Sequence, residues 1–536
     1  MKLSLIRISW VLIALAAGCS STSSSSDPGA PNPAPVTGLN RVNHIIILMM
    51  ENHSFDNYFG AIAYAPQSPY HASSGGCSDQ DHGCVDGLDC VADPSGGLTC
   101  TNSNQEDDAT AVVAFHEVSR CVVPDLAHSW LQVHQEANFN DPNTTLFSSP
   151  NDGFVRVNEA TDQPDAGVET PTDDQTMGYY TQDDIPFYYD LAQKFAISDR
   201  YFSSVLGPTL PNRFYLMAAT SFGHLTTGDA TAQGVFKPIT GTIFDLLDSA
   251  QVSWADYYQS GPQASAFRQW GGAGADPHLF PLQDFLTIVA GSSAAGALPQ
   301  VVLVDASGDN DEHPPADIQR GQAFTSQVIN AVRNGPYWKD SVIFITYDEH
   351  GGFFDHVPSP PAPQGSARTP DGISPGQCAD LSNPPISEQP GGGAHCTSLA
   401  DAQALCPALT QNLDGPYPQN CASFDQLGVR VPFVVVSPFA KPHYASHTIA
   451  DHASLLAFIE ARFLSDAASG TGTGNRRHLT LRDQYADTLM DLFDFDSAPS
   501  LDTEVGQAQP PVTDCTPGNP GTDGIRRAAR DDSAPQ

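Results

Sequence analysis

The amino-acid sequence predicts an α/β fold with a largely parallel sheet. Four short apolar runs have the composition of strands that are buried on both faces; they are His44–Met50, Gln300–Val304, Ser341–Tyr347 and Val431–Ser437. Helical patterns lie between or after these runs, at Phe187–Ala196, Gly321–Asn334 and His452–Leu464. Because strands and helices alternate along the chain, a layered α/β architecture is expected.

Length and composition agree with a folded domain that has a sizeable core. The chain has 536 residues, of which 40% are hydrophobic and 16% charged, as in globular proteins. We expect one domain over residues 39–496, followed by a flexible tail rich in Pro, Gly and Asp over residues 497–536. Two loop-rich insertions interrupt the predicted domain, one from Cys77 to Cys100 and one from Pro358 to Asn420.

The N-terminus predicts export. Lys2 and Arg7 precede an apolar run from Val11 to Ala17, which is typical of a signal peptide and too short for a membrane span. The run ends in LAAGC at Cys19, so residues 1–19 resemble the signal peptide of a bacterial lipoprotein, with lipidation expected at Cys19. Residues 20–38, rich in Ser and Pro, read as a flexible tether. Ser20 favours the outer membrane, and a periplasmic or secreted protein is the alternative.

The net charge of the chain argues against nucleic acid as a partner. The formal net charge of −38 disfavours nucleic-acid binding, because such a surface repels phosphates.

Of eleven cysteines, ten remain after Cys19, and in an oxidising compartment we expect them to form disulfides. Their spacing lacks the close pairs of zinc sites, and the connectivity stays open.

Acidic residues follow three of the predicted strands. Glu51 and Asn52 come directly after the first strand, and Asp348 and Glu349 come directly after the third. In open α/β sheets the binding crevice lies at the carboxyl ends of strands, so these residues should meet. Carboxylate and amide oxygens suit a divalent metal ion. Asp305 also follows a strand, but capping a turn is its favoured role.

A hydroxyl group stands in the segment SSVLGPTLPNR, residues 203–213. Its Gly/Pro turn should open a helix, and a helix N-terminus favours an anion such as phosphate. The string Thr-x-Pro-x-Arg also resembles the sulfatase signature, with Thr209 where the nucleophile precursor stands. The alternative interpretation is an ordinary turn with a capping threonine.

Taken together, the chain resembles the bacterial phosphoesterase family of phospholipases C and acid phosphatases, in the alkaline-phosphatase-like superfamily. The matching stretches are HIIILMMENHSFDNYFG, PDLAHSW, MGYYTQDDIPFYYDLAQKFAISDRYFSSVLGPTLPNRFYL, EHPP, ITYDEHGGFFDHV and LGVRVPFVVVSPFAKPHYASHTIADHASLLAFIEARF. The resemblance implies a three-layer α/β/α sandwich and one divalent metal ion of unknown identity. It implies that Glu51, Asn52, Asp348 and Glu349 are metal ligands, that Thr209 is both nucleophile and ligand, and that His128 and His313 line the phosphate site.

The chain also departs from that family. The family commonly has Arg where this chain has His53, and many phospholipases C read DENDGFFDH where this chain reads DEHGGFFDH. The large C-terminal region of the longer phospholipases C has no counterpart here, which puts phospholipid specificity in doubt. Two groups have weaker signals. His443, His447, Asp451 and His452 are expected to order the loop before the last helix, with a nitrogen-rich metal site as the alternative. Asp355 and His356 are expected to support the metal motif from outside, with direct catalysis as the alternative.

The predicted function is hydrolysis of phosphoric esters through a phosphothreonine intermediate. The substrate is a phosphodiester in a phospholipase C-like enzyme, with phospholipids among the candidates, or a phosphomonoester in an acid phosphatase-like enzyme. The expected membrane contact is the N-terminal lipid anchor. A sulfatase-like hydrolase and a catalytically inactive surface lipoprotein that binds its partners are the alternatives.

Overall fold

The computed structural model describes residues 38–508, with gaps at residues 74, 94–96, 107–109, 122–124, 138–150, 162–172, 222–226, 228–239, 269–270, 272–273, 293–295, 364–423, 425 and 466–475. The chain divides into two compact units, Met1–Val36 and Thr37–Gln536, and every described residue belongs to the second. The predicted signal peptide, Cys19 and most of the tether lie outside the described residues, as does most of the second insertion.

Within the described residues, eight strands form one sheet in the order β12-β11-β13-β1-β14-β15-β10-β16. Their bounds are β1 His44–Met50, β10 Ala196–Ser198, β11 Trp254–Tyr258, β12 Leu279–Pro281, β13 Val301–Asp305, β14 Ser341–Tyr347, β15 Phe433–Val436 and β16 Tyr444–Ser446. The pairs from β12 to β14 are parallel. Strand β15 runs antiparallel to both of its neighbours. The prediction of a largely parallel sheet is therefore confirmed.

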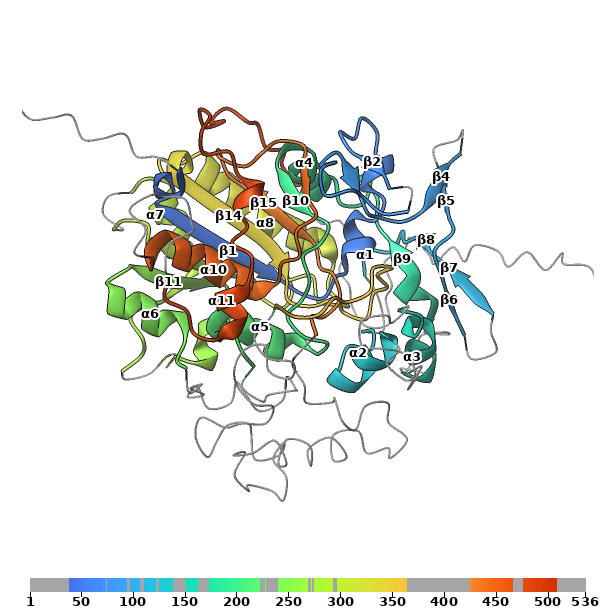
Figure 1. Cartoon of the computed structure of the whole chain (residues 1–536). Coiled ribbons are helices and arrows are strands. Elements are labelled where there is room, and N and C mark those ends of the chain that lie inside the picture. Colours follow the sequence, from blue (N-terminus) through green and yellow to red (C-terminus); the bar gives the residue numbers. More distant parts are fainter. Residues whose placement is uncertain are drawn as a thin grey trace, which may run out of the picture. The chain divides into compact units, whose positions relative to one another are not determined.

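The longer helices form two groups that Figure 1 shows on the two sides of the sheet. In one group α10 (His452–Phe463) contacts α5 (Thr209–Ala218) and α11 (Leu481–Tyr485), and α5 contacts α6 (Ile243–Ala250). In the other, α8 (Ile318–Arg333) contacts α4 (Pro186–Lys194) and α7 (Leu282–Val289). The predicted α/β/α layering is confirmed, and the three predicted helices correspond to α4, α8 and α10.

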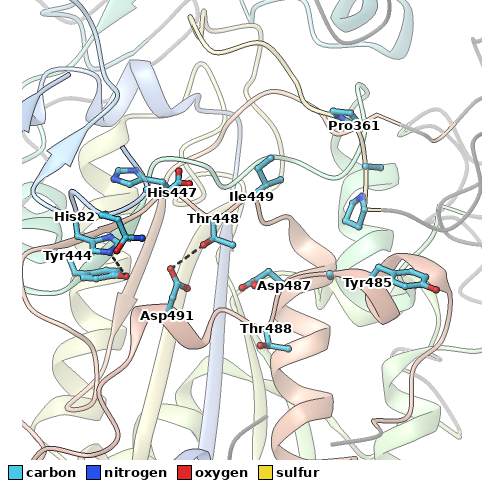
Figure 2. Close-up of a pocket in the computed structure, with 15 residues that line it drawn as sticks. His82, Pro361, Tyr444, His447, Thr448, Ile449, Tyr485, Asp487, Thr488 and Asp491 are labelled. Atoms are coloured by element: carbon cyan, nitrogen blue, oxygen red, sulfur yellow. Dashed lines mark hydrogen bonds between the residues drawn. The ribbon is translucent and has the colours of Figure 1, made fainter. Parts of the chain in front are cut away.

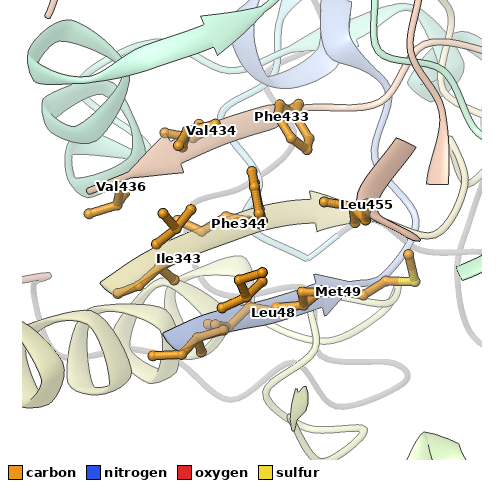
Figure 3. Close-up of a cluster of buried hydrophobic side chains, with 14 of the residues drawn as sticks. Leu48, Met49, Ile343, Phe344, Phe433, Val434, Val436 and Leu455 are labelled. Atoms are coloured by element: carbon orange, nitrogen blue, oxygen red, sulfur yellow. The ribbon is translucent and has the colours of Figure 1, made fainter. Parts of the chain in front are cut away.

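The central strands are apolar because both faces of the sheet are covered. Every residue of β14 is buried, as is every residue of β1 after His44. Figure 3 shows the side chains of β1, β14 and β15 side by side in this core, with Leu48, Phe344 and Val434 on the three strands. Large apolar side chains facing both helical layers explain why continuous apolar runs predicted these strands.

Smaller elements lie outside the main sheet. They are the helices α1 Phe55–Phe59, α2 Trp130–Glu136 and α3 Phe154–Thr161, and the strands β2 His71–Ala72, β3 Cys84–Val85, β4 Cys90–Ala92, β5 Leu98–Cys100, β6 Ser103–Gln105, β7 Ala111–Val113, β8 Phe115–His116 and β9 Gly178–Tyr179. Disulfides join Cys77 to Cys84 and Cys90 to Cys100, and Cys121 is also disulfide-bonded. The first predicted insertion is thus held by disulfides, whereas Cys378, Cys396, Cys406, Cys421 and Cys515 lie outside the described residues.

The described part of the domain runs past the predicted boundary at residue 496. The backbone oxygen of Glu504 accepts a hydrogen bond from Lys194 of α4 at 2.8 Å, and the Ala508 amide donates to Ser326 of α8 at 3.1 Å. Residues 497–508 therefore pack on the α4/α8 side of the domain. Among the described residues, no helix combines the length and the apolar character that crossing a bilayer requires.

Candidate active site

Two neighbouring strand ends bring the four predicted oxygen donors together. Strands β1 and β14 are parallel, with Met50 opposite Tyr347, so the residues that follow each strand leave the same edge of the sheet. The backbone amide of Asn52 donates to Asp348 Oδ1 at 3.3 Å. Glu51 is 9% exposed, and Asn52, Asp348 and Glu349 are fully buried.

Helix α5 brings the predicted nucleophile to the same place. Thr209 is its first residue, after Pro208 at the N-cap, and Thr209 Oγ1 lies 3.4 Å from Glu51 Oε2. One turn later, Arg213 Nη2 donates to Glu51 Oε1 at 2.6 Å, and Arg213 Nε lies 3.4 Å from Asp348 Oδ2. Burial lowers the pKa of Arg213, but Glu51 and Asp348 more than reverse this, so the guanidinium stays charged. Sequence reasoning gave Arg213 no role, although the Thr-x-Pro-x-Arg string contains it.

The oxygens at the strand ends converge in a way that suits a cation. The Asn52 side-chain amide lies 2.8 Å from Glu349 Oε1 and 3.0 Å from Glu51 Oε2, and in the orientation that satisfies its hydrogen bonds its nitrogen donates to both carboxylates while its oxygen accepts from His313 Nε2 at 3.1 Å. In the opposite orientation the amide oxygen faces the same two carboxylate oxygens, an arrangement that a cation between them would stabilise. Asp348 Oδ2 is buried and, apart from its ion pair with Arg213, has no hydrogen-bond partner among the described residues. Burial and the nearby Glu51 carboxylate raise the pKa of Asp348 well above its usual value. The donor set therefore fits a hard divalent ion, which prefers such oxygens.

His128 and His313 lie on the other side of these oxygens, with their ring centroids 5.8 Å apart. His128 Nδ1 donates to the Leu126 carbonyl at 2.7 Å, and its Nε2 lies 4.0 Å from Glu349 Oε1. His313 Nδ1 donates to the Pro314 carbonyl at 2.6 Å, and its Nε2 lies 3.1 Å from the Asn52 amide. In both rings the carbonyl contact fixes the orientation and directs Nε2 inward.

Two acidic residues beside these histidines were missed from the sequence. Asp125 lies 3.9 Å from His128 Nδ1 and 4.0 Å from His313 Nε2. Burial lowers the pKa of each histidine, but the neighbouring carboxylates outweigh it, so both pKa values are raised. The backbone oxygen of Asp311 accepts a hydrogen bond from the Glu51 amide at 2.9 Å. Both residues stand in or next to matching motifs, PDLAHSW and EHPP, which is the only signal the sequence offers for them.

Two glycines allow the close approach of the backbone segments around the site. Gly351 and Gly352 follow Glu349 with φ of +64° and +77°, values that side chains disfavour. A Cβ atom at Gly351 would lie 2.5 Å from the Asn52 carbonyl oxygen, and one at Gly352 would lie 2.6 Å from that of Ala127. The glycines thus let the turn after β14 contact the segments that carry Asn52 and His128.

The histidines near α10 do not form a cluster. His447 Nδ1 contacts Asp199 at 2.8 Å, His443 donates to the Gln193 carbonyl, and His452 Nε2 donates to the Asp348 carbonyl at 2.7 Å. Asp451 accepts from Arg482 at 2.9 Å. Each side chain thus holds a different segment. His452 is the one that contacts the backbone of a predicted ligand.

Asp355 and His356 belong to a charged network apart from the predicted ligands. Arg430 is fully buried and donates to Asp355 at 2.8 Å and to Asp56 at 3.0 Å. His356 Nδ1 contacts Asp56 at 2.7 Å, and its Nε2 lies 3.4 Å from Asp86. Asp56, Asp355 and His356 lie close enough together to share a metal ion, but the Arg430 guanidinium already supplies the positive charge there.

A cavity of about 970 Å³ lies elsewhere on the domain. Figure 2 shows His82, Tyr444, His447, Tyr485 and Asp491 around it. None of the predicted site residues lines this cavity, so it is separate from the site at the ends of β1 and β14.

Comparisons with known proteins identify the family. The phosphoesterase family model matches residues 42–464. The chain is 27% identical to non-specific phospholipase C6 of Arabidopsis thaliana, over 86% of this chain and 74% of that protein. It is 28% identical to non-hemolytic phospholipase C of Burkholderia pseudomallei, over 79% of this chain and 55% of that protein. It is 29% identical to phospholipase C A of Mycobacterium tuberculosis, over 79% of this chain and 73% of that protein.

Among solved structures, human ectonucleotide pyrophosphatase/phosphodiesterase 5 aligns over 58% of this chain and 94% of that one, with 10% identity and a TM-score of 0.31. That likeness is too low to bear on function. The family model spans both strand ends, α5 and the EHPP segment, which are the parts that build the site. The chain therefore belongs to the phosphoesterase family and is a phosphoric ester hydrolase.

Proposed function

We propose that the enzyme depends on one divalent metal ion and acts through a phosphothreonine formed on Thr209. The observation that carries the proposal is that Thr209, at the N-terminus of α5, lies 3.4 Å from Glu51 within a group of converging oxygen donors. Glu51, Asn52, Asp348 and Glu349 would hold the ion together with Thr209. A divalent ion there would lower the pKa of the threonine hydroxyl and offset charge on the phosphoryl oxygens.

The residues around Thr209 suit the remaining steps. The N-terminus of α5 favours an anionic phosphoryl group. Arg213, one turn further along α5, fixes the orientation of the Glu51 carboxylate. Thr209 Oγ1 attacks phosphorus, and the bond to the leaving oxygen breaks. His128 or His313 protonates that oxygen as the general acid, a role that contributes ~10²–10⁴-fold in other enzymes. Water then cleaves the bond between phosphorus and Thr209, which releases phosphate from a monoester substrate or a phosphorylated headgroup from a diester substrate.

The proposal also concerns the class of ester that the enzyme cleaves. The relatives named above are called phospholipases C, which favours a phosphodiester, including phospholipids. An acid phosphatase-like monoesterase is the second candidate. A sulfatase-like enzyme is disfavoured by threonine at the nucleophile position, and an inactive binding protein by the complete set of site residues.

One comparison tests these alternatives. Hydrolysis of p-nitrophenyl phosphorylcholine is compared with hydrolysis of p-nitrophenyl phosphate, each with and without a chelator. A phospholipase C-like enzyme cleaves the diester faster and loses that activity with the chelator. Faster cleavage of the monoester identifies a phosphatase, and activity that the chelator leaves unchanged contradicts the metal requirement.

We also propose that the enzyme is an exported lipoprotein, anchored through Cys19 to the outer membrane. The support is the sequence of residues 1–26, in which an apolar run, LAAGC and a serine tract follow one another. The acidic body is expected to stand off from anionic lipids and not to bind nucleic acid. Fractionation of cells that express wild type or Cys19→Ala tests this. Wild-type protein found wholly in the soluble fraction, with an unmodified N-terminus, would contradict the proposal.

A further inference from the structure

Glu312, the residue before His313, lies in a cage of three tyrosine hydroxyls. Glu312 Oε2 accepts hydrogen bonds from Tyr58 at 2.7 Å and from Tyr347 at 2.6 Å. Tyr188 contacts Glu312 Oε1 at 2.5 Å. The three tyrosines come from α1, β14 and α4, and both they and Glu312 are fully buried. One side chain is thus tied to three elements that are distant in the sequence.

The backbone at Glu312 needs such support. Its φ is +76°, in the left-handed region that costs a non-glycine residue about 1 kcal/mol. A conformation of this kind persists where the surroundings hold it. Besides the cage, the Glu312 carbonyl oxygen lies 3.1 Å from His53 Nε2.

The residues on both sides of Glu312 contact the active site. The Asp311 carbonyl accepts from the Glu51 amide at 2.9 Å, and His313 Nε2 lies 3.1 Å from the Asn52 amide. The His313 amide in turn donates to Asp311 Oδ1 at 3.1 Å. Displacing Glu312 would therefore move His313 relative to the oxygen donors.

Helix α8 leaves space for this arrangement. A Cβ atom at Gly321 would lie 2.0 Å from Glu312 Cγ, so any larger residue there would push the glutamate away. Gly321 is the fourth residue of α8, and glycine inside a helix costs up to about 1 kcal/mol relative to alanine. The glycine therefore makes α8 less stable, but it leaves room for Glu312 among the three tyrosines.

We propose that Glu312 is a positioning residue, which the three tyrosines hold in place so that His313 can protonate the leaving oxygen. This inference rests on the proposed role of His313 as general acid. The tyrosine hydroxyls act through Glu312 and do not touch the substrate. Removing one of them should weaken proton donation while leaving the metal ligands and Thr209 in place.

The test compares esters whose leaving groups differ in their need for an acid. Tyr58→Phe, Tyr188→Phe and Tyr347→Phe are compared with wild type on the p-nitrophenyl and glyceryl esters of whichever group, phosphate or phosphorylcholine, the enzyme cleaves. Nitrophenolate leaves without a proton, whereas an alkoxide needs one. We expect kcat for the glyceryl ester to fall by about tenfold, within the range of general acid catalysis. For the nitrophenyl ester kcat should fall by less than about twofold, with KM unchanged for both.

Two controls separate this role from a loss of packing. Tyr189 is the neighbour of Tyr188 and equally buried, but its hydroxyl donates to the Tyr180 carbonyl. Tyr189→Phe should leave the ratio of the two rates unchanged. In a His313→Ala background, which already lacks the acid, the Tyr188→Phe substitution should leave that ratio unchanged as well.

Equal losses on both esters, or a further change of the ratio without His313, would overturn the inference. Failure of the wild type to cleave either ester would instead refute the proposed function, and the positioning role with it. Thermal unfolding identifies a tyrosine variant that does not fold. Glu312→Gln, which keeps the size of the side chain, then replaces it and should show the same selective loss.

Discussion

Arg213 and Thr209 lie one turn apart on α5, and both donate to the carboxylate of Glu51, one to each oxygen. The arginine contacts Oε1 at 2.6 Å and leaves Oε2 facing the hydroxyl and the Asn52 amide. Glu51 thereby has one oxygen fixed by a permanent charge and the other directed toward the proposed metal position. The two oxygens of one carboxylate therefore have different neighbours, so the buried arginine is compatible with the proposed metal position.

Arg213→Gln should reduce both activity and stability. Breaking a buried ion pair typically costs about 3–5 kcal/mol, and the Glu51 carboxylate would lose its fixed orientation. We expect a lower melting temperature and a fall in kcat/KM of at least about tenfold. Arg213→Lys should recover little of the activity, because one ammonium group cannot donate through two nitrogens as the guanidinium does.

The matched control for this substitution is Arg268→Gln. Arg268 also forms ion pairs, with Asp276 at 2.6 Å and Asp248 at 3.4 Å, but it contacts none of the predicted site residues. The Arg268→Gln substitution should therefore leave kcat/KM unchanged. Wild-type rates in Arg213→Gln would show that Glu51 does not need its arginine.

The proposed ligands should lose metal and activity together. Glu51→Gln and Asp348→Asn keep the size of each side chain but remove its charge, which a divalent ion requires. Elemental analysis of the purified variants should show little bound metal and rates near background. Asp284→Asn on α7, away from the strand ends, is the control and should keep both. Full metal content in both ligand variants would contradict the assignment.

Thr209→Ala should abolish turnover without unfolding the protein. Thr209 is only partly buried and the cap of α5 does not depend on its side chain, so the melting temperature should stay within about one or two degrees. Thr209→Ser retains the hydroxyl and should keep measurable activity. Rapid acid quenching of wild type during turnover should yield a phosphorylated peptide that contains Thr209. A fully active Thr209→Ala enzyme would exclude this residue as nucleophile.

The sequence predicted the parts of the fold that depend on local patterns. Strands β1 and β14 have the predicted bounds, because residues covered on both faces give continuous apolar runs. Strand β13 was expected one residue early, and β15 is shorter than expected. The antiparallel direction of β15 could not be read, since it depends on a long connection whose path has no local pattern.

Local sequence patterns likewise predicted only part of the candidate site. Glu51 and Asp348 were predicted as metal ligands because acids directly after buried strands are a local signal, and Thr209 was predicted as nucleophile from its Gly/Pro turn and the Thr-x-Pro-x-Arg string; the structure brings the three together. The tyrosine cage around Glu312 had no signal, since Tyr58, Tyr188 and Tyr347 are far apart along the chain and look like ordinary core aromatics. Arg213 was visible only as one letter of a motif. Its importance follows from the carboxylate that the fold places beside it.

The pH dependence of stability should depend in part on His356. Burial alone would lower the pKa of this imidazole, but its contact with Asp56 and then with Asp86 raises it to about 10, against the effect of the neighbouring Arg430. Asp355, the other carboxyl group of this network, pairs with Arg430. A histidine whose pKa is raised by folding stabilises the protein fully below its unfolded pKa near 6.5. That contribution is lost as the pH rises through about 10.

Unfolding free energies measured in urea between pH 6 and pH 10 should therefore fall more steeply for wild type than for His356→Gln. The variant keeps a donor toward Asp56 but cannot titrate, so it should be less stable than wild type at pH 6 and approach it near pH 10. His71→Gln is the control, because His71 is exposed and its ion pair is with the exposed Asp81; it should leave the slope unchanged. Parallel curves for wild type and His356→Gln would mean that His356 does not gain its proton on folding, and that Arg430 alone neutralises Asp56.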